Sequence, residues 1–170
     1  RELGEGLIVL SGFEFGPLAP ALQADDFARA RAVATQLAEL FPRRFYIEVQ
    51  RGGHPQDERQ LQLACHLASE LGLPVVATHP VQFMQKSDFT AHEARVCIAE
   101  GELLGNPRRQ KKFNEEQYFL TQEEMEKRFA DLPVALANSV EIAKRCNLSL
   151  VLGQPRLPDF PTPPGITLDE

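Results

Sequence analysis

The sequence lacks several features by which classes of proteins are recognised. It has no tryptophan and only three cysteines among 170 residues. Cys65, Cys97 and Cys146 form no Cys-x-x-Cys pair, so we expect neither a disulfide framework nor a zinc knuckle but reduced thiols, as in a cytoplasmic protein. No apolar run approaches the roughly 20 residues that a membrane-spanning helix requires, and no membrane partner is expected.

Catalytic signatures are also missing. The chain contains no His-x-His pair, no phosphate-binding P-loop and no dinucleotide-binding glycine pattern. Ser11 lacks the Gly-x-Ser-x-Gly turn of a nucleophilic serine. The net charge of −6 argues against a DNA-binding surface on this segment, because contacts with DNA phosphates rely on clustered Lys and Arg. We interpret the basic cluster at residues 108–112 mainly as a solvated loop, with a partner or nucleic-acid contact as the alternative.

What the sequence does contain is an alternation of short apolar runs with amphipathic stretches. Apolar runs predict strands at residues 7–10, 45–49, 75–77 and 148–152, of which the third is expected inside the sheet. Helical spacing recurs over residues 27–41, 57–71, 89–99, 121–129 and 133–147. The stretch 13–24, with Gly16, Pro17 and Pro20, is expected to be a loop. This order predicts one α/β domain over residues 1–152, with parallel strands and flanking helices.

The ends of the predicted helices carry local signals. Asp25 or Asp26 can cap the first helix, and Gly72 suits the end of the second. Thr121 and Glu124 have the spacing of a capping box. Residues 153–170 are rich in proline, which predicts an extended linker. The sequence begins with Arg1 rather than Met, and we expect a piece of a longer protein.

Polar side chains follow the predicted strands. In α/β folds, chemistry gathers at the carboxyl ends of the strands, where loops converge on a rigid sheet. The candidates there are Glu48, His54, His79 and Gln82. We interpret Glu48 either as a partner of Arg51 or as a group behind a former metal site. We interpret His92 as a core histidine that donates to a backbone carbonyl, with a metal ligand as the alternative. Spacing alone identifies no catalyst.

Five stretches, taken in order, resemble the motifs of one family. They are residues 7–12, 45–49, 72–78, 88–95 and 137–146. The family is the polymerase-and-histidinol-phosphatase (PHP) domain of bacterial DNA polymerase III alpha subunits, with the proteobacterial form most similar. Residues 157–163 resemble the segment that leaves this domain toward the polymerase palm. The resemblance implies that residues 1–152 are the later part of a distorted (β/α)₇ barrel and that 153–170 are the linker toward the palm.

The resemblance also implies where metal ligands would stand. Active relatives carry Cys or His where this chain has Phe13, and Asp-x-His where it has Pro80 and Gln82. None of these three side chains suits a catalytic transition metal, so we expect no catalytic and no metal-binding residue. What would remain is the entrance of a vestigial site, lined by Glu48, His54, His79 and Gln82.

The function that the resemblance implies is that of a scaffold. The parent would be a DNA-directed DNA polymerase, a nucleotidyltransferase of DNA replication that uses Mg²⁺ and contacts DNA outside this segment. This segment would need no cofactor and would dock the proofreading exonuclease subunit within the polymerase III core. The alternative is an active metal-dependent phosphoesterase or 3′–5′ exonuclease that holds Zn²⁺ or Mn²⁺ with Glu48, His54 and His79, and with His92 as a further candidate. A third reading is a free-standing interaction domain unrelated to replication.

Overall fold

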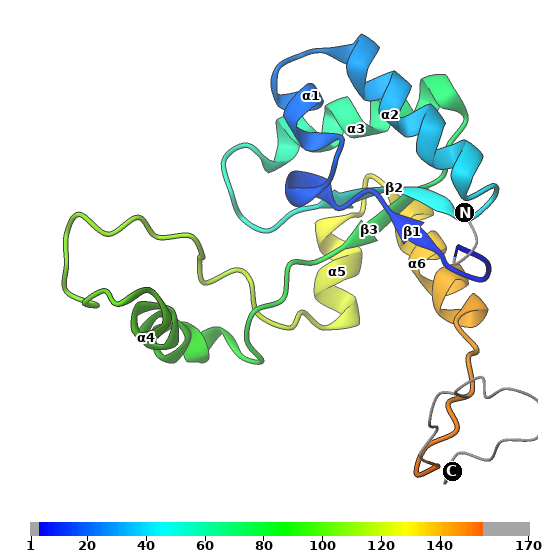
Figure 1. The fold of residues 1–170 in the computed structure, drawn as a ribbon. Coiled ribbons are helices and arrows are strands. Elements are labelled where there is room, and N and C mark those ends of the chain that lie inside the picture. The colour runs from blue at the N-terminus through cyan, green and yellow to red at the C-terminus, as the bar shows by residue number, and fades with distance from the viewer. Residues whose placement is uncertain (1–3, 155–170) are drawn as a thin grey trace, which may run out of the picture.

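A computed structural model of the chain describes residues 4–154, which form a parallel sheet with helices on both of its faces (Figure 1). The three strands are β1 (Val9–Leu10), β2 (Phe45–Gln50) and β3 (Val75–Thr78), in the order β1-β2-β3. The predicted α/β class with parallel strands is therefore confirmed. Three strands do not make a closed barrel, and the described residues contain no more.

The interior strand of the sheet is β2. The sequence predicted that position for the run at residues 75–77, which instead forms β3. Val9 of β1 pairs with Phe45, and Val75 of β3 pairs with Ile47. β3 lies at an edge of the described sheet and is nevertheless largely buried, because α6 packs against it. The side chain of Asn138 on α6 donates to the backbone oxygen of Val75 at 2.7 Å. Burial under α6 thus explains why β3 is apolar although it pairs with only one strand.

One face of the sheet is covered by α1 (Ala19–Gln23), α2 (Phe27–Leu40) and α3 (Asp57–Leu71) (Figure 1). Asp26 caps α2 by accepting from the amide of Arg29 at 3.0 Å, and Gly72 ends α3 in the left-handed conformation, as predicted. The expected loop at residues 13–24 is wrong. A 3₁₀ turn, η1 (Phe13–Phe15), and α1 occupy it. Pro20 lies in the first turn of α1, where a helix does not use its amide hydrogen.

The opposite face carries α5 (Gln122–Arg128) and α6 (Pro133–Arg145). The capping box predicted at the start of α5 is present: the amide of Thr121 donates to Glu124, and the amide of Glu124 donates to the Thr121 hydroxyl. Phe129, which follows α5, is fully buried. It belongs to the core, which also contains these buried side chains of both helical layers and of β2: Ala30, Ala34, Phe45, Ile47, Val49, Leu61, Leu67 and Ala135.

The strand predicted at residues 148–152 is wrong. This stretch forms no strand in the structure, and Leu148, Leu150 and Leu152 are 84%, 70% and 82% exposed. A strand needs a neighbour for its backbone N–H and C=O groups, and no neighbour lies beside it within residues 4–154. Of the linker predicted at 153–170, residues 155–170 lie outside the described part of the chain. No helix within the described residues is long and apolar enough to span a membrane.

A separate lobe contains η2 (Lys86–Asp88) and α4 (Phe89–Glu100), set apart from the sheet (Figure 1). It is joined to the rest by residues 79–85 and 101–120, which meet in a bridge between Phe83 and Tyr118. Gly101 ends α4 with a positive φ, as expected of a terminal glycine. The buried side chains of α4 are His92, Glu93 and Cys97.

Candidate functional site: the carboxyl edge of the sheet

Glu48 lies where the three strands end and is 9% exposed. Its Oε2 accepts from the amide of Gly12 at 2.9 Å, beyond β1. Its Oε1 accepts from the hydroxyl of Thr78 on β3 at 2.5 Å and from the side-chain amide of Gln50 at 3.1 Å. The amide of Glu48 in turn donates to the Ser11 hydroxyl at 2.9 Å. Both carboxylate oxygens therefore accept hydrogen bonds from the protein, and Glu48 links the ends of all three strands.

Arg51 does not pair with Glu48, so that interpretation of Glu48 is wrong. Arg51 forms ion pairs with Glu58 and with Asp131, and its guanidinium lies over the ring of Phe129 at 5.1 Å from the centroid. These contacts join the end of β2 to α3 and to the turn before α6. The two carboxylates are the first causes of the raised pKa of Arg51, which is permanently charged.

His54 and His79 both contact the segment 114–116. The ring of His79 donates from Nε2 to the backbone oxygen of Glu116 at 2.9 Å, while Nδ1 is buried without a partner among the described residues. Nε2 of His54 lies 3.3 Å from the side-chain amide of Asn114. Burial lowers the pKa of His79 below its usual range, so the imidazole is neutral at pH 7. Both rings position this segment.

The three predicted ligand positions lie at the ends of the same strands. Phe13 is 5% exposed and takes a positive φ of 38° at the start of η1. Pro80 packs on the loop after β2, where a Cβ added to Gly52 would come within 2.7 Å of the proline ring. The backbone amide of Gln82 donates to the oxygen of Gln117 at 2.8 Å, and its side chain lines a hollow beside α4.

His92 does not join the other histidines. Its ring packs between Phe83, at 5.3 Å, and Phe113, at 4.9 Å. Neither ring nitrogen has a hydrogen-bond partner within the described residues, so the expected bond to a backbone carbonyl is wrong. Among residues 4–154, no three side chains of His, Cys, Asp or Glu come together in a group that could hold a metal ion.

Sequence reasoning missed the ionic network at this edge. Glu116 binds Lys86 at 2.5 Å and Arg128 at 2.9 Å, and the Lys86 contact is the first cause of its lowered pKa. Arg128 also donates to the backbone oxygen of Arg51. Glu116, Arg128 and Arg51 line a hollow of about 340 Å³, which His54 and Asp57 also line. They come from segments far apart in the sequence, and no local pattern in the sequence indicates their contact.

The basic cluster at residues 108–112 is only in part a solvated loop. Arg108 is exposed and Lys112 pairs with Glu100 at the surface. Arg109, by contrast, is an almost fully buried side chain that binds the equally buried Glu93 of α4. The ion pair holds the segment 101–120 against α4. Interpreting Arg109 as a solvated residue is therefore wrong.

Over nearly its whole length, the chain is similar in sequence to segments of known proteins. No protein-family model matches the chain. Over 169 residues, 99% of its length, the chain is 49% identical to DNA polymerase III subunit alpha of Pseudomonas fluorescens. It is 51% identical over 166 residues to the protein of that name from Neisseria meningitidis serogroup A, which covers 97% of the chain. Identity to the Escherichia coli K12 protein is 47% over 161 residues, 95% of the chain. The chain spans 14% of the length of each of these relatives.

Proposed function

Because the chain is homologous along its length to one segment of the DNA polymerase III alpha subunit, we propose that it works as part of a replicative, DNA-directed DNA polymerase in the cytoplasm. The chain spans 14% of the length of those relatives, and in this proposal nucleotide transfer, Mg²⁺ and DNA contacts belong to other parts of such a polymerase. The segment itself is the later part of a PHP domain, a distorted (β/α)₇ barrel. The parallel strands with helices on both faces support this assignment.

Within that polymerase, the segment is a catalytically silent scaffold. The observation that carries this proposal is the state of Glu48, whose two carboxylate oxygens are both bound by donors from three strand ends. Three of the roughly four acceptor sites of this carboxylate are thereby used to hold the edge of the sheet, which supports a structural role for Glu48. The non-ligating Phe13, Pro80 and Gln82 at the same edge support the same conclusion.

The partner of this scaffold is the proofreading exonuclease subunit of the polymerase III core. Docking a second protein requires a surface that keeps its shape, because ordering a mobile surface on binding costs free energy. The carboxyl edge meets this requirement: Arg51, Arg128 and Glu116 join β2, α5 and the segment 113–118 through ion pairs and backbone hydrogen bonds.

The alternative, an active metal-dependent phosphoesterase, would need Glu48, His54, His79 and His92 to act together on Zn²⁺ or Mn²⁺. In the structure Glu48 is bound by strand-end donors, while His79 donates to Glu116. His92 lies between two phenylalanine rings. Among residues 4–154 these side chains form no group that could hold a metal ion, so activity through them would require them to move together.

A competition experiment tests the docking role. The full-length alpha subunit that carries this segment is immobilised, the exonuclease subunit is bound to it, and the 170-residue chain is added in increasing excess. We expect the chain to displace the exonuclease subunit in a saturable way. Failure to displace it at about a hundredfold excess, with the chain folded by circular dichroism, would contradict docking on this segment.

Metal-dependent hydrolysis is measured in parallel. The chain is incubated with Zn²⁺ or Mn²⁺ and bis(p-nitrophenyl) phosphate, and release of nitrophenolate is followed. We expect no release above that of the metal alone. Turnover that disappears in His79→Ala and survives in the surface control His66→Ala would establish the phosphoesterase instead.

A further inference from the structure

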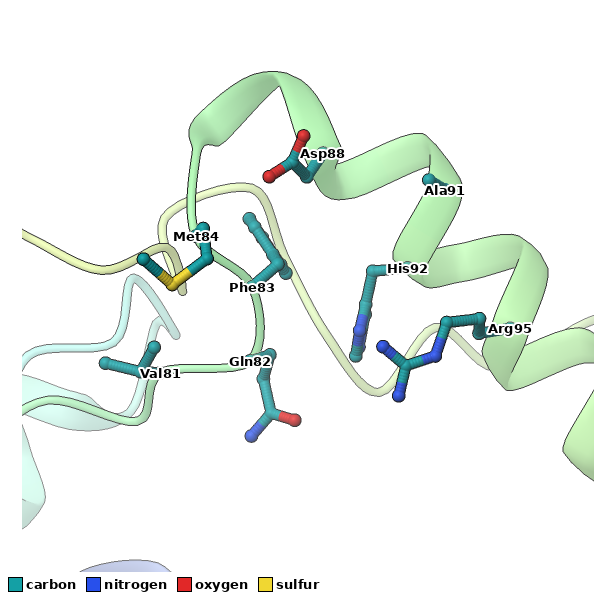
Figure 2. A pocket seen from close by; sticks show the side chains of 8 residues that line it. All are labelled: Val81, Gln82, Phe83, Met84, Asp88, Ala91, His92 and Arg95. Atoms are coloured by element: carbon teal, nitrogen blue, oxygen red, sulfur yellow. The ribbon is translucent and has the colours of Figure 1, made fainter.

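A hollow of about 440 Å³ lies between α4 and the segment that leads into it (Figure 2). Its volume lies in the range of small-molecule sites, which are mostly apolar with a few convergent polar groups. Val81, Phe83 and Met84 supply apolar wall, and Met84 is 67% exposed. The hollow is separate from the hydrogen bonds of Glu48 and from the network around Glu116.

Three polar side chains converge on one side of this hollow. His92 and Arg95 stand three residues apart and therefore share a face of α4. Figure 2 shows the ring nitrogens of His92 directed to the space between the amide of Gln82 and the guanidinium of Arg95. All three groups can donate hydrogen bonds, and the guanidinium of Arg95 is positively charged, so the acceptor they suit is an anion.

Arg95 and His92 have no partner for their donor groups within residues 4–154. Within residues 4–154, no ion pair uses Arg95. Both ring nitrogens of His92 are buried and without a hydrogen-bond partner, and the residue is 8% exposed. Buried polar groups without partners are costly, and a ligand that accepts from the imidazole recovers part of this cost.

The other charges around the hollow do not cancel this preference. Asp88 also lines it, but seven residues of helix separate Asp88 from Arg95, roughly 10 Å along the axis. One oxygen of Asp88 already accepts from the amide of Gln85 at 3.0 Å. Glu93, the neighbour of His92, is bound by Arg109. The end of the hollow near Arg95 is therefore the end that suits negative charge.

We propose that this hollow binds a small organic oxyanion. The anionic head lies between Gln82, His92 and Arg95, and an apolar or aromatic body lies against Val81 and Met84. A charged head with hydrogen bonds from Arg and His is held by charge-assisted contacts, which are stronger than neutral ones. The thioether of Met84 makes favourable contacts with a ring. This binding site goes beyond the scaffold role and does not depend on it.

Calorimetric titration of the 170-residue chain tests the site with three probes. Thymidine 5′-monophosphate and benzoate carry a ring with a phosphate or a carboxylate, and inorganic phosphate carries the head alone. We expect saturable binding of at least one ring-bearing probe, about tenfold or more tighter than inorganic phosphate. The comparison of the first two distinguishes a phosphate head from a carboxylate head, and either result supports the site. No binding of either ring-bearing probe, or equal binding of inorganic phosphate, would overturn the proposal.

Variants assign the binding to these residues. Arg95→Gln and Gln82→Ala alter exposed side chains and leave the fold intact, and we expect Arg95→Gln to weaken binding about tenfold or more, as loss of a charged hydrogen bond does. Arg29→Gln, which removes the same charge from the exposed face of α2, is the matched control and should bind as the unaltered chain does. In ¹⁵N spectra the ring nitrogens of His92 should shift on binding. Equal weakening in Arg95→Gln and Arg29→Gln, or unshifted His92 nitrogens, would refute the assignment.

Discussion

The hydroxyl of Thr78, the last residue of β3, donates to the carboxylate of Glu48 in β2 across 2.5 Å. The contact joins two residues that are 30 positions apart in the sequence. With the bond from the amide of Gly12 to the same carboxylate, it ties both outer strands to the central one at the edge where α/β proteins place their chemistry. A side chain that could be read as part of a former reaction site thus holds the sheet together.

Replacing Glu48 tests this structural role. Glu48→Ala leaves the part-buried donors of Gly12 and Thr78 without their acceptor and removes one of two acceptors of the Gln50 amide, and we expect a loss of about 2–4 kcal/mol in the free energy of unfolding. Urea denaturation followed by circular dichroism measures the loss. The control is Glu39→Ala, at an exposed position of α2, with an expected change of about 0.5 kcal/mol or less. A Glu48 variant as stable as this control would contradict the role of Glu48 in linking the strand ends.

Gly52 gives a test of the packing around Pro80. A Cβ at this position would come within 2.7 Å of the proline ring, which is rigid, and the amide of Gly52 donates to Asp57 at 2.7 Å. We expect Gly52→Ala to lower the free energy of unfolding by about 1–3 kcal/mol, as overpacking does. Gly105→Ala is the matched control because no atom lies within 4 Å of its added Cβ. If both variants unfold at the same urea concentration, the loop does not pack on Pro80 as described.

The ion pair of Asp131 with Arg51 predicts a pH dependence. Hydrogen bonds from Arg51 lower the pKa of Asp131 from 3.8 to about 2. A depressed carboxyl pKa contributes stability above the pKa of the unfolded chain, and the contribution is lost as the pH falls toward 2. Asp131 is 65% exposed, so the effect is small and weakens in salt.

Unfolding is therefore measured between about pH 5 and pH 2 for the unaltered chain and for Asp131→Asn. We expect the difference in stability between the two to shrink as the pH falls. Glu39→Gln, at an exposed position of α2, should follow the unaltered chain. A difference in stability that stays constant over this range would show that the contribution of the Asp131–Arg51 pair does not depend on protonation of Asp131.

The buried ion pair between Glu93 and Arg109 predicts a local effect. Removing one partner leaves the other charge buried, which loosens the segment 101–114 against α4. We expect Arg109→Ala to accelerate chymotrypsin cleavage after Leu103, Leu104 or Phe113. Arg108→Ala, at the exposed neighbouring position, is the control. The interpretation fails if both variants are cleaved at the rate of the unaltered chain.

Local signals in the sequence predicted local structure well. The caps at Asp26, Gly72 and Thr121 depend on residues within one helical turn, and the structure confirms each of them. The three strands were found because runs such as residues 45–49 are apolar and rich in β-branched or aromatic side chains. Pro20 was misread because proline both breaks helices and begins them, and neighbouring residues alone did not separate the two.

Contacts between distant segments could not be predicted in the same way. Arg51 and Asp131 are 80 positions apart, and Arg109 lies in a run of basic residues that is indistinguishable by composition from a solvated loop. Leu148 to Leu152 have the composition of a strand, but a strand requires a neighbour that composition does not reveal. The candidate side chains were accordingly expected at the carboxyl edge of the sheet, where Glu48 and His79 lie, while the hydrogen-bond partners of these side chains were not predicted.

The hydrogen bonds of Glu48 have a further consequence for the motions of the protein. The carboxylate of Glu48 accepts from the amide of Gly12, and the amide of Glu48 donates to the hydroxyl of Ser11, so the end of β1 is held by two bonds to one residue. Exchange of the Gly12 and Glu48 amide hydrogens with deuterium should then be a single cooperative event, governed by one side chain in the middle strand.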